Sequence, residues 1–138
     1  MGGATNELTV VRDGAEMVRQ MRPERVAGRF VFRALAPDAV AARLPEIRGL
    51  FVEAEGLSAI LPATRTDRDA MAQITLQVRS ALDGVGLTAA VSTALAGAGI
   101  PCNMVAGLRH DHLFVPETRA DEALDILRRL SGSDSEKG

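Results

Sequence analysis

The segment Ile100–Pro116, IPCNMVAGLRHDHLFVP, contains the only cysteine and both histidines of the chain. A thiolate is a nucleophile and a soft metal ligand, and imidazoles act as bases or as ligands. His110 and His112 flank Asp111, and Cys102 lies a few residues earlier. One cysteine and two histidines nominally reach the three protein ligands of a catalytic zinc.

The spacing within this segment favours structural roles. On a strand, Cys102 shares a side with Met104 and Ala106, an apolar face that we expect to be buried. Its neighbours supply no charge that would lower the thiol pKa, so a Cys–His nucleophile is not favoured. We therefore expect neither a catalytic residue nor a metal site in this segment, and we expect the two histidines to lie in a turn. Asp111 can fix that turn by accepting backbone N–H groups. The alternative for His110 and Asp111 is contact with a ligand at a subunit junction.

A second candidate is the sequence GVGLTA at residues 84–89, which matches the G-x-G-x-x-A pattern of dinucleotide sites. The preceding strand alternates polar and apolar residues, unlike a buried parallel strand, and no acidic residue ends the next one. We therefore expect no nucleotide cofactor. The same loop can bind a smaller ligand, because N–H groups at a helix N-terminus attract a carboxylate.

In that interpretation Gly86 allows close approach of the backbone, and Asn103 holds an ammonium through its side-chain oxygen. The alternative is ordinary capping with tight packing of the helix on a sheet. The complete set of candidate ligand-binding residues is Val85, Gly86, Leu87, Thr88, Asn103, Met104, His110 and Asp111.

Regular elements around these residues follow from periodicity. Ile74, Leu76 and Val78 alternate with polar residues, as in a half-buried strand. Leu87–Ala98 is an expected helix that ends at Gly99. Two short strands follow, joined by a hairpin at Arg109–Asp111. These strands are Cys102–Gly107 and His112–Val115.

A last helix is expected after Pro116, with a capping box between Thr118 and Asp121. Its apolar face comprises Ala120, Ala123, Leu124, Leu127 and Leu130. The order in this half is therefore β-α-β-β-α. Compared with a ferredoxin-like βαββαβ unit, this half lacks its final strand. That strand is supplied by the other half, or the open edge is covered in a dimer.

The first half has a fainter version of the same order. Ala15–Met21 is a short expected helix, Gly28–Leu35 a strand, and Ala39–Leu44 a helix that Pro45 truncates. A hairpin with its turn at Glu55-Gly56 completes this half. It joins Leu50–Ala54 to Leu57–Leu61. Strand, helix and hairpin thus occur twice, a repeat of architecture rather than of residues. The polar segment Pro62–Ala70 separates the halves.

Composition excludes several classes of function. The chain of 138 residues is 46% hydrophobic, has a net charge of -2, and contains no Trp or Tyr. Without a basic run or aromatic platforms, we expect no nucleic-acid binding. We also expect no membrane span, because no apolar run approaches ~20 residues. We expect a cytoplasmic location, because a single cysteine cannot form an internal disulfide and the N-terminal residues do not resemble a signal peptide.

The region Val85–Pro116 resembles the ACT domain of aspartokinase-like regulatory regions. The resemblance lies in Gly86 after the first strand, VSTALA in the helix, GIPCNMV entering the second strand, the HDHLFVP hairpin and the helix RADEALDILRRL. The segment FVEAEGLSAILP, Phe51–Pro62, resembles the preceding half-domain of small stand-alone bacterial proteins with two ACT-like units.

The resemblance implies an α+β fold of two tandem ferredoxin-like ACT units. We expect an N-terminal ACT-like half-domain at residues 1–66, an ACT domain at 67–131 and a disordered tail at 132–138. It also implies a non-catalytic regulatory protein that forms a homodimer and binds an amino acid at an inter-unit or dimer interface. The alternative is an interaction module of the same fold that binds no ligand.

Overall fold

The computed structural model describes residues 10–11 and 13–132 of the chain. The predicted tail beyond Gly132 lies outside these residues. The described strands form one six-stranded sheet of order β2-β3-β1-β4-β6-β5, with every neighbouring pair antiparallel. The strands are β1 (Pro23–Leu35), β2 (Gly49–Glu53), β3 (Gly56–Pro62), β4 (Met71–Leu76), β5 (Asn103–Ala106) and β6 (Asp111–Pro116).

Strands β1 and β4 serve both halves of the chain. The first residues of β1, Pro23–Val26, pair with β4 and provide the strand that the C-terminal half lacks. The later residues of β1, Phe30–Leu35, pair with β3 of the N-terminal hairpin. Each half thereby completes a four-stranded ferredoxin-like sheet, with β1 and β4 common to both. The expected α+β fold of two tandem units is confirmed, and the missing strand comes from within the chain.

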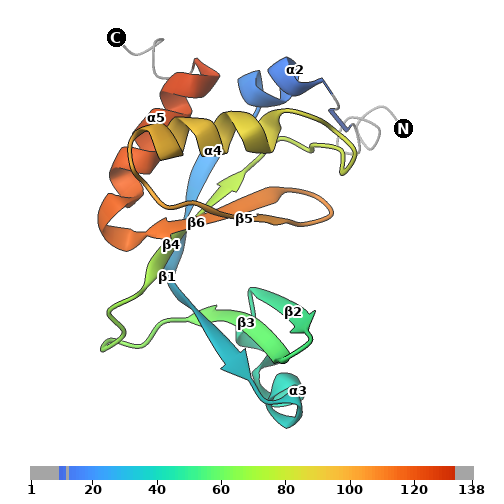
Figure 1. The fold of residues 1–138 in the computed structure, drawn as a ribbon, viewed down its shortest axis with the longest axis vertical. Coiled ribbons are helices and arrows are strands. Elements are labelled where there is room, and N and C mark those ends of the chain that lie inside the picture. Colours follow the sequence, from blue (N-terminus) through green and yellow to red (C-terminus); the bar gives the residue numbers. More distant parts are fainter. Residues whose placement is uncertain (1–9, 12, 133–138) are drawn as a thin grey trace.

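A bend in β1 makes this double use possible. The pairing of β1 with β4 shifts register between Val26 and Phe30. Within that interval Gly28 has φ 108°, a value that residues with a Cβ rarely adopt. Such a bulge increases the local twist of a strand. β1 therefore runs from the helical end of the molecule into the lobe that contains β2 and β3 (Figure 1).

The helices that cover the sheet of the C-terminal half gather on one face of it, and one of them, α2, precedes β1 in the chain (Figure 1). They are α2 (Gly14–Arg19), α4 (Leu87–Gly97) and α5 (Ala120–Ser131). The alternate β4 residues Ala72, Ile74 and Leu76 face them, as the period-two pattern predicts. From the helices Met17, Val91, Leu95, Ala123 and Leu127 complete this helix-side core, each almost fully buried.

Between β1 and β2 the chain forms a short helix, α3 (Val40–Arg43), flanked by two 3-10 turns, η1 (Pro37–Ala39) and η2 (Leu44–Glu46). The predicted helix Ala39–Leu44 is thus shortened, because Pro45 begins the second turn. This helical segment packs over a small core of Val31, Leu35, Ala59, Leu61 and Ala70.

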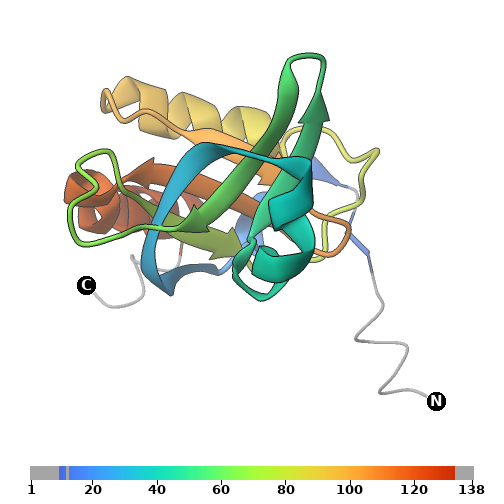
Figure 2. The ribbon, with the colours of Figure 1, turned by 90° about the horizontal axis from the view of Figure 1, so that it is seen from below.

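The helix-free faces of the two halves meet in an aromatic contact. Phe30 of β1 and Phe114 of β6 are edge-to-face, with ring centroids 6.2 Å apart. Phe32 approaches the same Phe114 ring at 5.5 Å. Ile60 of β3 completes this cluster. Viewed from below, β2 and β3 lie over the sheet of the C-terminal half (Figure 2).

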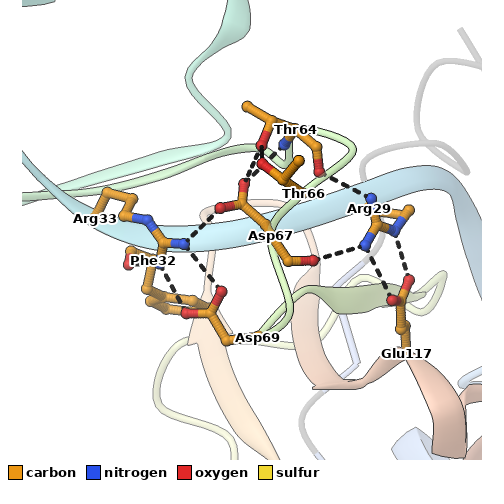
Figure 3. A network of polar contacts seen from close by, with 8 residues as sticks. All are labelled: Arg29, Phe32, Arg33, Thr64, Thr66, Asp67, Asp69 and Glu117. Atoms are coloured by element: carbon orange, nitrogen blue, oxygen red, sulfur yellow. Dashed lines mark hydrogen bonds and ion pairs between the residues drawn. The ribbon is translucent and has the colours of Figure 1, made fainter.

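A polar network holds the segment between β3 and β4, which contains no helix (Figure 3). Arg29 pairs with Glu117 through Nε and Oε2 at 2.6 Å, and it also donates to the carbonyls of Thr64 and Asp67. Arg33 donates from both terminal nitrogens to Asp69, at 2.8 and 2.9 Å. These contacts fix the linker against β1 and against the start of the last helix.

Several local expectations need correction. No side chain within the described residues caps α5, so the capping box of Thr118 and Asp121 does not form. A 3-10 turn, η3 (Glu117–Arg119), precedes the helix instead. The hairpin turn lies at residues 54–55, and Gly56, with φ 141°, begins β3. β4 ends at Leu76, because the N–H of the following residue, Gln77, donates to the carbonyl of Met21 outside the sheet ladder.

Candidate functional site

A hollow of about 120 Å³ lies beside the N-terminus of α4. Four of the residues predicted from the sequence to bind a ligand line this hollow. They are Gly86, Leu87, Thr88 and Asp111. The remaining lining residues are Met17, Ser80, Ala81, Leu82, Gly84 and Ala106. The hollow therefore joins the start of α4 to the start of β6.

The N-terminus of α4 presents backbone donors. Gly86 is the N-cap residue with φ 117°, and no side chain among the described residues caps the helix. The first helical bond runs from the N–H of Ala90 to the carbonyl of Gly86. The N–H groups of Leu87, Thr88 and Ala89 precede that bond and are available to an anion. Leu87 anchors the turn, because its side chain is buried in the helix-side core.

A carboxylate lies on the other side of the hollow. Ser80 Oγ donates to Asp111 Oδ2 at 3.0 Å. Ser80 is positioned by an isolated parallel bridge to Val11, whose N–H donates to the carbonyl of Arg79. Asp111 opens β6 opposite Ala106 of β5, so the sheet edge fixes its backbone. Helix donors and a carboxylate thus share one small polar hollow.

Sequence reasoning missed two residues here. Ser80 lies in an irregular turn-rich segment where no periodicity singles it out. Gly14, at the start of α2, packs so closely that an added Cβ would lie 2.4 Å from the Val85 carbonyl oxygen. The Gly-Gly contact with Gly86 could have been found only with knowledge of the fold, since 72 positions separate the two residues.

The other nominated residues lie elsewhere. Asn103 is at the far end of β5, where its Nδ2 donates to the carbonyl of Phe114 at 3.3 Å. Met104 packs against the helix-side core. His110 lies in the turn before β6, where its carbonyl accepts from the N–H of Gly107. Val85 belongs to the loop, but its side chain is 81% exposed and does not line the hollow.

A second cavity, which we call the inter-unit cleft, has a volume of about 330 Å³. It opens between the β2–β3 hairpin and β5, and none of the nominated residues lines it. Its walls are mainly apolar, with Glu53 as the single charged side chain. The lining comprises Phe32, Gly49, Leu50, Phe51, Glu53, Ser58, Ala59, Ile60 and Val105.

Comparison with protein families assigns both halves of the chain. Models of the ACT domain match residues 11–76 and residues 71–129. The chain belongs to the ACT domain family. The two matches overlap at residues 71–76, which are the residues of β4, the strand that both ACT units share. ACT domains are regulatory, non-catalytic domains that generally bind small molecules.

Solved structures give the same fold. The chain is similar to protein VC0802 of Vibrio cholerae, with 36% identity and a TM-score of 0.71, over 92% of this chain and 96% of that one. VC0802 is described as a protein of unknown function and possible transport protein. Protein Atu0741 of Agrobacterium tumefaciens, at 19% identity and a TM-score of 0.63, covers 79% of this chain and 87% of its own. Among curated proteins no match was found.

On the helix-free face of the C-terminal ACT unit, polar side chains of β4 and β6 form a cluster. His112 Nδ1 lies 2.9 Å from Thr75 Oγ1 and 3.4 Å from Gln73 Nε2. Burial lowers the pKa of His112, the nearby His110 lowers it further, and Asp111 opposes both effects. Gln73 Oε1 and His110 Nδ1 are buried without a partner among the described residues. His112 is therefore neutral at neutral pH.

This burial predicts a pH dependence of folding. The folded pKa of His112 lies below its ordinary 6.5, so the unfolded chain binds the proton first as the pH falls. The free energy of unfolding should decline as the pH falls below 6.5 and level off once the pH is below the folded pKa of His112. Urea titrations at several pH values check this. In His112→Gln the decline that begins at pH 6.5 should vanish; a persisting decline would contradict the assignment.

Cys102 and His112 lie on opposite faces of the ACT sheet. Cys102 packs against the helix-side core, whereas His112 contacts Thr75 on the helix-free face. A thiolate and an imidazole in these places cannot form a nucleophile–base pair, which requires hydrogen-bond reach. Within the described residues, no three His, Cys, Asp or Glu side chains gather to hold a metal ion.

The Cys102 thiol should be slow to react. Burial raises its pKa, which lowers the fraction of reactive thiolate at neutral pH. We expect a chromogenic disulfide reagent to label the folded protein at least about tenfold more slowly than the urea-unfolded chain. Equal rates in both states would instead identify an accessible, activated thiol.

No helix within the described part of the chain is both long and apolar enough to cross a membrane.

Proposed function

We propose that this ACT protein is a non-catalytic regulator that binds a small amino acid in the hollow beside α4. One observation carries the proposal: Leu87 and Thr88, at the N-terminus of α4, and Asp111, at the start of β6, line the same hollow. A zwitterionic amino acid offers the matching charges, with its carboxylate toward the helix and its ammonium toward Asp111.

The size of the hollow limits the ligand. A volume of about 120 Å³ suits the charged end of an amino acid, not a nucleotide or a sugar. The side chain then extends outward over the exposed loop at Val85. There a second copy of the protein, as a homodimer, can sense which amino acid is bound. The original candidate for the ammonium contact, Asn103, is replaced in this proposal by Asp111, with Ser80 orienting its carboxylate.

A panel of amino acids tested by thermal unfolding examines this proposal. A ligand that binds only the folded state stabilises it by ~2.7 kcal/mol at 100 times its dissociation constant. We expect one amino acid, or a few related ones, to raise the unfolding midpoint of the wild-type protein. Asp111→Asn should lose the response, whereas Asp125→Asn, an exposed carboxylate on α5, should keep it.

The runner-up function is an interaction module of the same fold without a ligand. A flat response across the panel, with the protein folded, would favour that function. An equal response of Asp111→Asn and wild type would place the ligand outside the hollow.

A further inference from the structure

The inter-unit cleft has the size and the lining of a small-molecule site, and the proposed function makes no use of it. Its volume of about 330 Å³ lies within the usual range of such sites, ~300–1,000 Å³. It shares no lining residue with the hollow beside α4. Mainly apolar walls with a few polar groups are typical of cavities that bind organic molecules. The cleft is therefore a candidate second site.

Both ACT units contribute to the cleft. Phe51 and Glu53 are alternate residues of β2, so their side chains point to the same face of the hairpin. Ile60 of β3, which pairs with Phe32 of β1, also lines the cleft. Val105 of β5 comes from the C-terminal unit. The hairpin lies over the sheet of that unit, so a ligand in the cleft would contact both (Figure 2).

Two aromatic rings in the lining are partly open to a ligand. The side chain of Phe51 is 70% exposed, and that of Phe32 is 41% exposed although its ring contacts Phe114. The face of such a ring attracts a cation within about 6 Å of its centroid. The neighbouring Phe30 already has one, because the guanidinium of Arg48 lies 5.2 Å from its centroid. Within the described residues, no cation lies over the two rings of the cleft.

Glu53 is the single charged residue of the lining. Ser58 Oγ donates to its Oε1. No cationic side chain in the described part of the chain forms an ion pair with Glu53. A carboxylate without a cation, beside two uncovered aromatic rings, is the combination that recognises an organic ammonium ion.

We propose that the inter-unit cleft binds a small organic amine as its ammonium ion. The charge lies at Glu53 and the two rings, and the apolar body of the ligand packs against Ile60 and Val105. A divalent metal ion does not suit this lining, because it requires about six oxygen ligands and the cleft offers one carboxylate. A free amino acid does not suit it either, because no cationic side chain among the described lining residues would receive its carboxylate.

Three probes with the same aromatic body test the charge preference. Isothermal titration calorimetry compares phenethylamine, phenylpropionate, which has a carboxylate in place of the amine, and phenylalanine, which has both groups. We expect phenethylamine to bind at least about tenfold more tightly than the other two. Hexylamine provides a second amine with an aliphatic body. Equal binding of phenethylamine and phenylpropionate, or no binding of either amine at millimolar concentration, would overturn the proposal.

Variants of the hairpin test the position of the site. Glu53→Gln keeps the shape of the side chain and should weaken phenethylamine binding at least about tenfold. The matched control is Glu55→Gln, an exposed residue of the hairpin turn that does not line the cleft. It should bind phenethylamine as the wild type does. Phe51→Leu should weaken binding about two- to fivefold through loss of the ring. An unchanged affinity in Glu53→Gln would overturn the proposal.

The same variants separate this inference from the proposed function. Asp111→Asn, in the hollow beside α4, should bind phenethylamine with wild-type affinity and lose the response to amino acids. Glu53→Gln should show the opposite pattern. Loss of phenethylamine binding in Asp111→Asn would place the amine in the hollow and overturn the assignment of the cleft. A flat response to the amino acid panel leaves the phenethylamine test intact, because the two sites share no lining residue.

Discussion

Replacing Gly86 with valine is expected to abolish the stabilisation of the protein by its amino acid ligand. Gly86 has φ 117°, where a β-branched residue is strained by about 1–3 kcal/mol. A Cβ at this position would also lie 3.3 Å from the Cα of Gly14. To relieve the backbone strain and the close contact with Gly14, the first turn of α4 must move. The N–H groups of that turn, beside the hollow, move with it. The ligand-induced shift of the unfolding midpoint should fall to the level of a non-ligand.

The matched control is Gly99→Val. Gly99 also has a positive φ, 72°, but an added Cβ would meet no atom within 4 Å, and the residue follows the far end of α4. This variant should lose stability through backbone strain and keep its full ligand response. Gly86→Ala provides a milder test if the valine variant does not fold. A ligand response that survives in both Gly86 variants would contradict the role of this loop.

Phe114→Ala should be the most destabilising of the single changes considered. The ring is buried and makes edge-to-face contacts with Phe30 and Phe32, so it joins β6 to the part of β1 that pairs with β3. Deleting a buried phenylalanine costs about 3–5 kcal/mol. Urea unfolding followed by circular dichroism measures this. Leu108→Ala, at an exposed position, should stay within about 0.5 kcal/mol of wild type.

The same variant tests whether the two ACT units fold as one body. Because β1 and β4 belong to both units, loss of Phe114 should weaken hydrogen-exchange protection in β3 as well as in β5. Protection lost in the C-terminal unit alone would show that the shared strands do not couple the two halves.

Elements with strong periodicity were predictable from the sequence. The helix predicted at Leu87–Ala98 is observed at Leu87–Gly97, and the alternation at Ile74 and Leu76 places these residues in the helix-side core. The double role of β1 was not predictable, because it depends on a bulge near Gly28 and on pairings between distant segments. The sequence left open whether the strand missing from the C-terminal half comes from the same chain. The bulge allows β1 of the same chain to supply it.

The candidate site was predictable only where it is local. Gly86, Leu87 and Thr88 could be predicted because they begin a helix. Asp111 could be predicted because it lies at a hairpin turn. Asn103 was assigned to the same site from its place at the start of a strand. The strand parity puts its side chain on the helix-free face beside Phe114, whereas the hollow lies at Ala106. Ser80 has no sequence signal, because its position depends on a bridge to Val11.

The most direct test of the amino acid site is a titration followed by amide chemical shifts of the labelled protein. The ligand found in the thermal panel should move the N–H resonances of Leu87, Thr88 and Ala89 in wild type and leave them unmoved in Asp111→Asn. Resonances around the inter-unit cleft should stay in place. Shifts that gather at Phe32, Phe51 and Val105 instead, or shifts that are unchanged by Asp111→Asn, would contradict the proposed function.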